Sequence, residues 1–126
     1  MSTIKANTLL HSDGSTTTQP SIPALDTRMA KAWVNFNQTG TLAIRASFGV
    51  SSVTDNGSGD VTVNFTTAFA DINYAPVALF NGASGGAVTS PHYNGAPSTS
   101  SYRIGSRRTD NMNASDSQYA NIVFFR

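Results

Sequence analysis

The sequence contains no cysteine and no glutamate among its 126 residues. Without cysteine the chain can form neither a disulfide bridge nor a thiolate metal site. Lysine occurs only at positions 5 and 31, so the straight-chain residues that favour helices are scarce. Serine, threonine and asparagine make up about a third of the chain, and they favour strands and turns. These features predict an all-β protein without covalent cross-links.

Charge is also sparse, because Asp, Lys and Arg together make 12% of the chain, against roughly 25% in an average soluble domain. The net charge is +1, and no basic run is longer than Arg107-Arg108, so we expect no nucleic-acid partner. No apolar run is long enough to span a bilayer, and residues 1–10 lack the apolar core of a secretory signal. We therefore expect no membrane insertion, and folding in a reducing cytoplasm.

Apolar side chains recur at every second position in two stretches, residues 42–50 and 61–65. This period of two is typical of half-buried strands, whose successive side chains point to opposite faces of a sheet. Asn56-Gly57 supplies a turn between the two stretches. The pattern predicts strands over residues 32–37, 41–50, 61–66, 75–80, 102–107 and 118–126. We expect residues 30–126 to form an antiparallel, jelly-roll-like β-sandwich.

Residues 1–29 form a different kind of segment, which is polar and interrupted by Pro20 and Pro23. Its few apolar residues cannot build a core, so the segment is predicted to be an extended arm. Two interpretations stay open, a disordered terminus and docking onto another subunit. For docking onto a particle, the candidate contacts are Ile4, Leu9 and Leu10.

No catalytic or metal-binding motif is present. The two histidines, His11 and His92, stand in no known catalytic spacing, and no nucleophile-elbow, Walker or zinc-protease motif occurs. The run Asp55–Asp60 lacks the ligand spacing of a calcium loop and is better explained as a turn. We expect no enzymatic activity, no cofactor and no metal.

A long segment rich in Gly, Ser and Pro, residues 81–101, is predicted to be a loop, and aromatic and basic residues gather in and after it. Flat apolar rings combined with amide and guanidinium donors are groups that proteins use to recognise sugars or other proteins. A receptor or glycan contact, packing between subunits and a plain flexible loop all remain possible here. The candidate contact residues are His92, Tyr93, Asn94, Tyr102, Arg107 and Arg108.

The last predicted strand, residues 118–126, is apolar on both faces, so both faces are expected to be buried. We expect its outer face and the Phe124-Phe125 pair to pack between protomers, which removes apolar area from water. A lone strand tryptophan such as Trp33 belongs in a core or an interface more often than in a ligand site. The predicted subunit-interface residues are Trp33, Tyr119, Val123 and Phe125.

The segments KAWVNFN, TDNG, TVNFTTA and NYAPV, within residues 30–77, resemble a module of tail-fibre and other virion structural proteins of tailed bacteriophages. The opening STIKANTL is similar to the beginnings of such proteins. The resemblance covers about 40% of the chain. It implies a β-rich, commonly trimeric domain that is attached to a virion and presents loops outward.

Two virion roles follow from this resemblance. The first is a short fibre or fibre-tip protein, a homotrimer that docks to the particle through its arm and meets a host-surface glycan or protein. The second is a capsid decoration or cement protein that stabilises the shell. The long shaft repeats of large fibres are absent from this sequence. The expected partners are copies of the chain and other virion proteins of the capsid, portal, neck or tail.

Overall fold

The computed structural model describes residues 5–8, 10, 12–14, 28–82, 88–93 and 95–126, and for residues 82 and 88–93 it describes the backbone only. Eight strands make up the described domain. They are β1 (Ala30–Asn37), β2 (Ala43–Phe48), β3 (Val50–Gly57), β4 (Asp60–Phe65), β5 (Ala75–Gly82), β6 (Val88–Tyr93), β7 (Ser101–Arg108) and β8 (Ser117–Phe125). The described residues before Arg28 belong to no strand.

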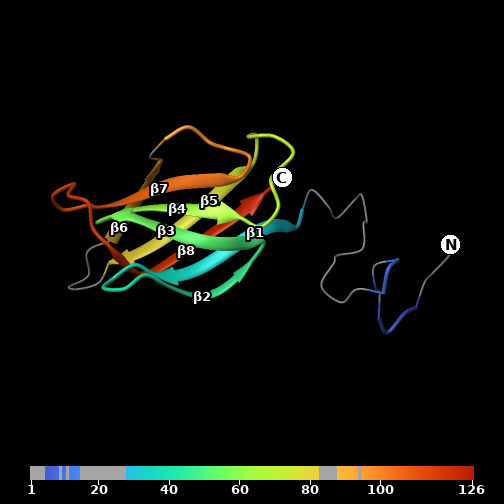
Figure 1. Cartoon of the computed structure of the whole chain (residues 1–126). Helices are drawn as coiled ribbons and strands as arrows, with labels where there is room; N and C mark the ends of the chain where they lie inside the picture. Colours follow the sequence, from blue (N-terminus) through green and yellow to red (C-terminus); the bar gives the residue numbers. More distant parts are fainter. Residues whose placement is uncertain (1–4, 9, 11, 15–27, 83–87, 94) are drawn as a thin grey trace.

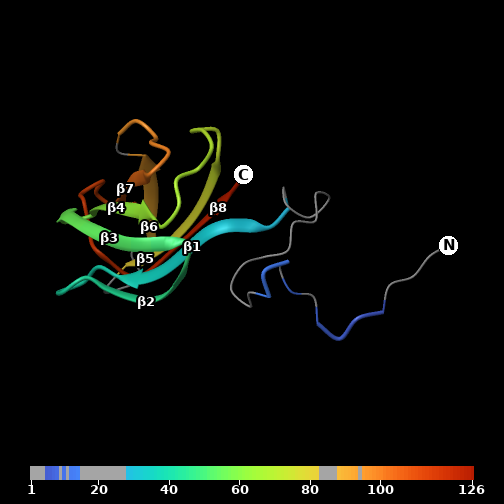
Figure 2. The same cartoon turned by 45° about the vertical axis from the view of Figure 1, so that its right-hand side comes forward.

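All eight strands join one antiparallel ladder in the order β2-β1-β8-β5-β6-β7-β4-β3. This ladder folds over on itself into a sandwich (Figures 1 and 2). One layer holds β2, β1, β8 and β5, the facing layer holds β7, β4 and β3, and β6 connects them. The order β8-β5-β6-β7 is a Greek key, because three hairpin-connected strands are followed by a fourth that returns beside the first. A jelly roll contains two Greek keys, and the key formed by β5 to β8 corresponds to one of them.

The core lies between the two layers and is built by the inward-facing residues of six strands together with Tyr74. Phe124 of β8 is fully buried at its centre. Its ring packs edge-on against the rings of Phe65 and Tyr102, with centroids 4.9 and 5.5 Å away. Such edge-to-face pairs add stability beyond the area that they bury, so these rings hold the two layers together.

The all-β sandwich that the sequence predicts is confirmed. The strand predicted over residues 41–50 is in fact two strands, β2 and β3, because Gly49 between them has a φ of 66° and turns the chain. The alternation of apolar residues continues across this turn and conceals it. The predicted loop over residues 81–101 was also wrong in part, since β6 lies inside it and pairs with β7 along residues 89–93.

Gly49 is required for close packing as well as for its φ angle. A Cβ at this position would lie 2.7 Å from the carbonyl oxygen of Lys31, which is backbone and cannot move aside cheaply. Gly40 has a similar φ of 71° but open space around it. A side chain added at Gly40 would therefore meet conformational strain alone, whereas one added at Gly49 would meet both strain and steric overlap.

We predict that Gly40→Ala lowers the free energy of unfolding by about 1–2 kcal/mol, the cost of a left-handed backbone. Gly49→Ala carries the same cost plus the overlap with the backbone of β1, so its loss should be clearly larger. Urea unfolding of both variants measures the difference. Equal losses would show that the contact between Gly49 and β1 is unimportant.

Candidate functional site

The outer face of the four-stranded layer carries a row of apolar side chains that crosses all four strands. The register pairs Trp33 with both Phe48 and Val123, and Val123 with Val77. Directly paired residues of antiparallel strands point to the same face, about 5 Å apart. We call these four residues the apolar row: Phe48, Trp33, Val123 and Val77.

Most of the apolar row is in contact with solvent. Val77 is 60% exposed, Trp33 is 37% exposed, and Val123 is half-buried. The row is flanked by Leu79, which is 70% exposed, and by the half-buried Phe125. Soluble monomers rarely expose contiguous apolar surface of this kind, and where it occurs it marks an interaction site.

Polar contacts border the apolar row on one side. Asn35 and Asn121, which are paired across β1 and β8, form a side-chain hydrogen bond of 2.5 Å in which Nδ2 of Asn35 donates. Tyr119 lies farther along β8, and the guanidinium of Arg45 from β2 lies 4.4 Å from the centroid of its ring, which is a cation–π contact. An apolar centre with a polar rim is the usual composition of a protein–protein interface.

The structure brings the four predicted interface residues, Trp33, Tyr119, Val123 and Phe125, onto this one face. The prediction that Phe124 packs between protomers is wrong, because its side chain alternates inward and is fully buried in the core. Sequence reasoning missed Phe48, Val77 and Leu79. Both Val77 and Leu79 are apolar alternating positions of β5, but only the pairing with β8 shows that they face outward.

One of the predicted receptor residues does not lie at the surface. Tyr102, expected in an exposed position, is buried, and its ring packs against Phe124 and Tyr74. The backbone of His92 and Tyr93 belongs to β6, whereas their side chains and the whole of Asn94 lie outside the described residues. A glycan contact at these positions stays a prediction.

The two predicted arginines of β7 are held locally. Nε and Nη2 of Arg108 donate to the two carboxylate oxygens of Asp110, at 3.0 and 2.7 Å. This bidentate bond lowers the pKa of Asp110. Nη1 of Arg107 donates to the carbonyl oxygen of Met112 at 3.3 Å. Both arginines therefore help to order the 109–116 connection.

Of the residues predicted to dock onto a particle, Leu10 is 49% exposed. Ile4 and Leu9 lie outside the described residues. Docking by this segment stays a prediction.

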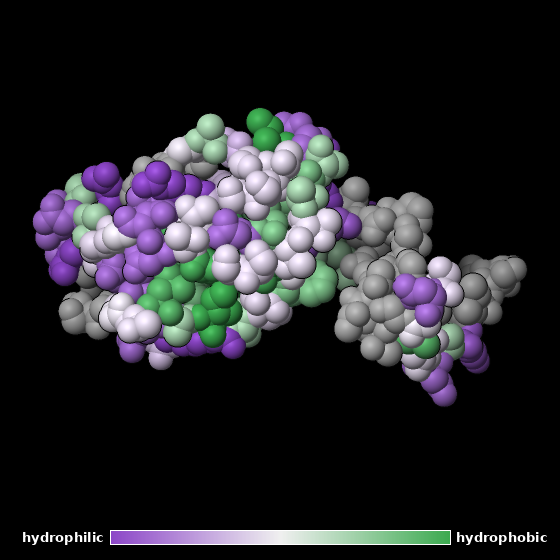
Figure 3. Space-filling model, in the orientation of Figure 1, coloured by the Kyte–Doolittle hydropathy of each residue, from purple (hydrophilic) through white to green (hydrophobic). Residues whose placement is uncertain are grey.

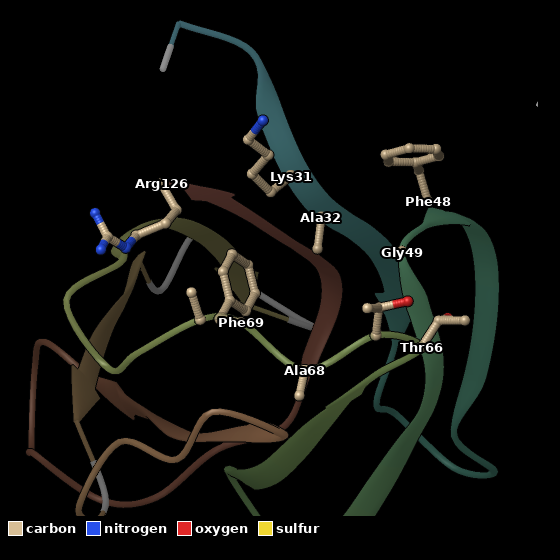
Figure 4. Close-up of a pocket in the computed structure, with 10 residues that line it drawn as sticks. Lys31, Ala32, Phe48, Gly49, Thr66, Ala68, Phe69 and Arg126 are labelled. Carbon is tan, nitrogen blue, oxygen red and sulfur yellow. The ribbon is translucent and has the colours of Figure 1, made fainter. Parts of the chain in front are cut away.

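A cavity of about 540 Å³ opens at the end of the sandwich where β1 begins (Figure 4). Its wall is mainly apolar, and Phe69 points into it between the rim residues Lys31 and Arg126. Phe48 belongs to both this cavity and the apolar row, so the two features adjoin. The volume is within the range of small-molecule sites, roughly 300–1,000 Å³.

The rim of the cavity is fixed by an ion pair between Arg126 and Asp71. The pKa of Asp71 is lowered, first by the backbone N–H of Asn73, which donates to its Oδ1 at 2.8 Å, and then by Arg126. Among the described residues that line the cavity, Lys31 and Arg126 are the ionisable ones, and they do not form an acid–base pair. Its chemistry suits the binding of an apolar group.

Metal-ligating side chains do not cluster in threes anywhere in the part of the chain that the structure describes. Among the same residues, no helix of a length and apolarity suited to crossing a membrane occurs.

Trp33 is the sole tryptophan, so its fluorescence reports on the apolar row alone. If a partner covers the row, emission should move to shorter wavelength and acrylamide quenching should fall as protein concentration rises. Ile72 is also half-exposed but lies outside the strands, so it is the control position when exposed residues of this face are substituted. Emission that stays quenchable at every concentration would show that copies of the chain do not cover this face.

The geometry on this face, an apolar centre with a polar border, supports binding of a macromolecular surface more than chemistry on a small molecule. Comparisons with protein families, with curated proteins and with solved structures found no match to this chain.

Proposed function

We propose that this chain is a bacteriophage virion structural protein, a short fibre or fibre-tip protein that assembles as a homotrimer. In this proposal, residues 1–29 attach it to the particle. Surface loops meet the host, on a glycan or a protein. The chain acts by binding and carries out no chemistry.

The observation that carries the proposal is the apolar row with its neighbour Leu79. Burying a side chain such as Leu79 or Val77 against another protein contributes roughly 1.5–3 kcal/mol when the burial is complete. Several such side chains lie on one rigid sheet face, so ordering them costs little at the moment of binding. A sheet face of this kind favours a permanent assembly, as a virion requires.

The segments that resemble phage virion proteins lie in the sandwich itself. KAWVNFN is β1 from its second residue, TVNF ends β4, and NYAPV leads into β5. Two of these strands, β1 and β5, contribute outward residues to the apolar face. The resemblance and the candidate interface thus concern the same part of the molecule.

A capsid decoration or cement protein is the second candidate. It is favoured by one observation, that the exposed apolar residues lie side by side on a broad sheet face. Cement proteins need an adhesive face and an arm that reaches neighbouring subunits, and an apolar sheet face would serve that role as well. The two candidates differ in where the protein sits on the particle.

We predict that Leu79→Asp breaks the homo-oligomer, because it places a charge on the most exposed large apolar residue of the face. Phe125→Asp should act in the same direction. Light scattering after size exclusion measures the mass of each variant. The matched control Ile72→Asp introduces the same charge outside the strands and should leave the mass unchanged. An oligomer that persists in both Leu79→Asp and Phe125→Asp would remove this face as the interface.

The virion role is tested by immunogold electron microscopy of particles of the virus that encodes the chain, with antibodies raised against the purified protein. Label at the tail or its fibres is the result expected for a fibre protein. Label distributed over the capsid would select the cement role. Purified particles that carry no label would overturn both.

A further inference from the structure

The two ends of the strand ladder, β2 and β3, are consecutive in the sequence and are separated only by Gly49. They do not pair with each other, although β2 ends and β3 begins at the same end of the sandwich. From Gly49 they diverge toward the other end (Figure 1). We call the strip between them the seam. Its floor comes from Leu42, Ile44 and Val53, all packed on or beside the core.

The seam exposes side chains that belong to the inner face of the sandwich. Ile44 is paired with the fully buried Phe36, so it points inward, yet it is 39% exposed. Val53 is paired with the fully buried Val63 and is only partly buried itself. In Figure 3, hydrophobic side chains gather between the positions that β3 and β2 occupy in Figure 1. The core is thus incompletely covered along this strip.

The backbone at the seam is also incomplete. Each terminal strand of the ladder pairs on one side only. In the described domain, both β2 and β3 therefore turn a row of unpaired backbone N–H and C=O groups toward the seam. Exposed edges of this kind accept an added strand, which forms main-chain hydrogen bonds while its alternate side chains enter pockets. An extended segment placed here would pair with both edges and cover Ile44 and Val53 together.

The chain itself carries a segment with the required pattern. Along residues 3–10 one face of an extended strand would present Ile4, Ala6, Thr8 and Leu10, whereas Thr3, Lys5, Asn7 and Leu9 would point the other way. Its eight residues are enough to run along the six residues of β2. In the single chain, Lys5–Thr8 and Leu10 join no ladder, and Leu10 is 49% exposed.

We infer that residues 3–10 of one copy add as a strand to the seam of a neighbouring copy. The described residues of the arm lie beyond the end of the sandwich at which β1 begins (Figures 1 and 2). Gly49 closes the seam at that same end, since it contacts Lys31 and Ala32 of β1. The open part of the seam therefore lies away from the end at which β1 begins, and a neighbour's segment is the occupant that the exchange assigns to it.

This exchange rests on the proposed function, because it needs an assembly of copies, and it names the partner of the first part of the arm. Each copy gives one strand and accepts one, so the contact is head-to-tail and closes when the copies form a ring. Asp55, paired with the buried Val61, sets a charge on the inner row of β3. The apolar floor therefore ends before Asp55, which limits the added strand to a short segment.

The absence of cysteine from the natural chain makes disulfide trapping specific. We would mix equal amounts of two full-length variants, one with Ala6→Cys and one with Ser47→Cys, under mild oxidation. Ser47 is an exposed β2 residue whose partner, Val34, faces inward, so its thiol would border the seam. A parallel mixture with Thr8→Cys allows for a shift in register. Thr62→Cys, on the central strand β4, replaces Ser47→Cys in the control.

We expect a disulfide between the two different chains for Ser47→Cys and none for Thr62→Cys. An oligomer that forms without this disulfide in either arm variant would overturn the exchange and leave the proposed function standing. A chain carrying both cysteines that closes the disulfide only within itself would also overturn it. A chain that stays monomeric at every concentration would overturn the exchange together with the proposed trimer.

A second measurement does not depend on new cysteines. The full-length double variant Ile4→Asp, Leu10→Asp changes only residues outside the sandwich, so the domain should fold. We expect the amides of β2 and β3 to exchange with deuterium at least tenfold faster in this variant than in the natural chain. The amides of β8, at the centre of its layer, serve as the internal control and should not change. Identical exchange of β2 and β3 in both proteins would show that the arm does not occupy the seam.

Discussion

β1 and β8 pair with each other at the centre of the four-stranded layer, and their register determines which side chains of both strands enter the core and which face outward. Val34 and Ile122 are paired and enter the core, whereas Trp33 and Val123, one position away, are paired and face outward. A slip of one residue would exchange these two sets, exposing the core row and burying the amides of Asn35 and Asn121. The register between β1 and β8 therefore determines both the core and the candidate interface.

The sequence predicted those parts of the fold that depend on local alternation. The class, the strands around residues 32–37, 61–66 and 75–80, and the last strand follow from the period of two and the turn residues. Gly49 was missed because the apolar alternation runs through it from Phe48 to Val50. β6 was missed because its Ser and Pro content is typical of a loop, and its pairing with β7 is a tertiary effect that no local pattern reveals.

The candidate site was predicted in part for the same reason. β8 is apolar on both faces, and its inner face is buried in the core as predicted, whereas burial of its outer face against a neighbour stays a prediction. Which phenylalanine lies where could not be known, because Phe124 and Phe125 differ only in register. Phe48, Val77 and Leu79 come from strands far apart in sequence, and only the ladder order brings them to one face. Tyr102 was misplaced because an aromatic ring beside a loop suits a core as well as a binding surface.

The position of β8 also sets a condition on how the chain is made. This strand lies between β1 and β5, and Asn35 reaches a partner 86 positions later. During synthesis, the edges of β1 and β5 that pair with β8 leave the ribosome without a partner strand until β8 has emerged. Non-local pairing of this kind slows folding and leaves apolar strands open to aggregation. Because charge is sparse, hydroxyl and amide groups must keep the nascent chain in solution during that interval.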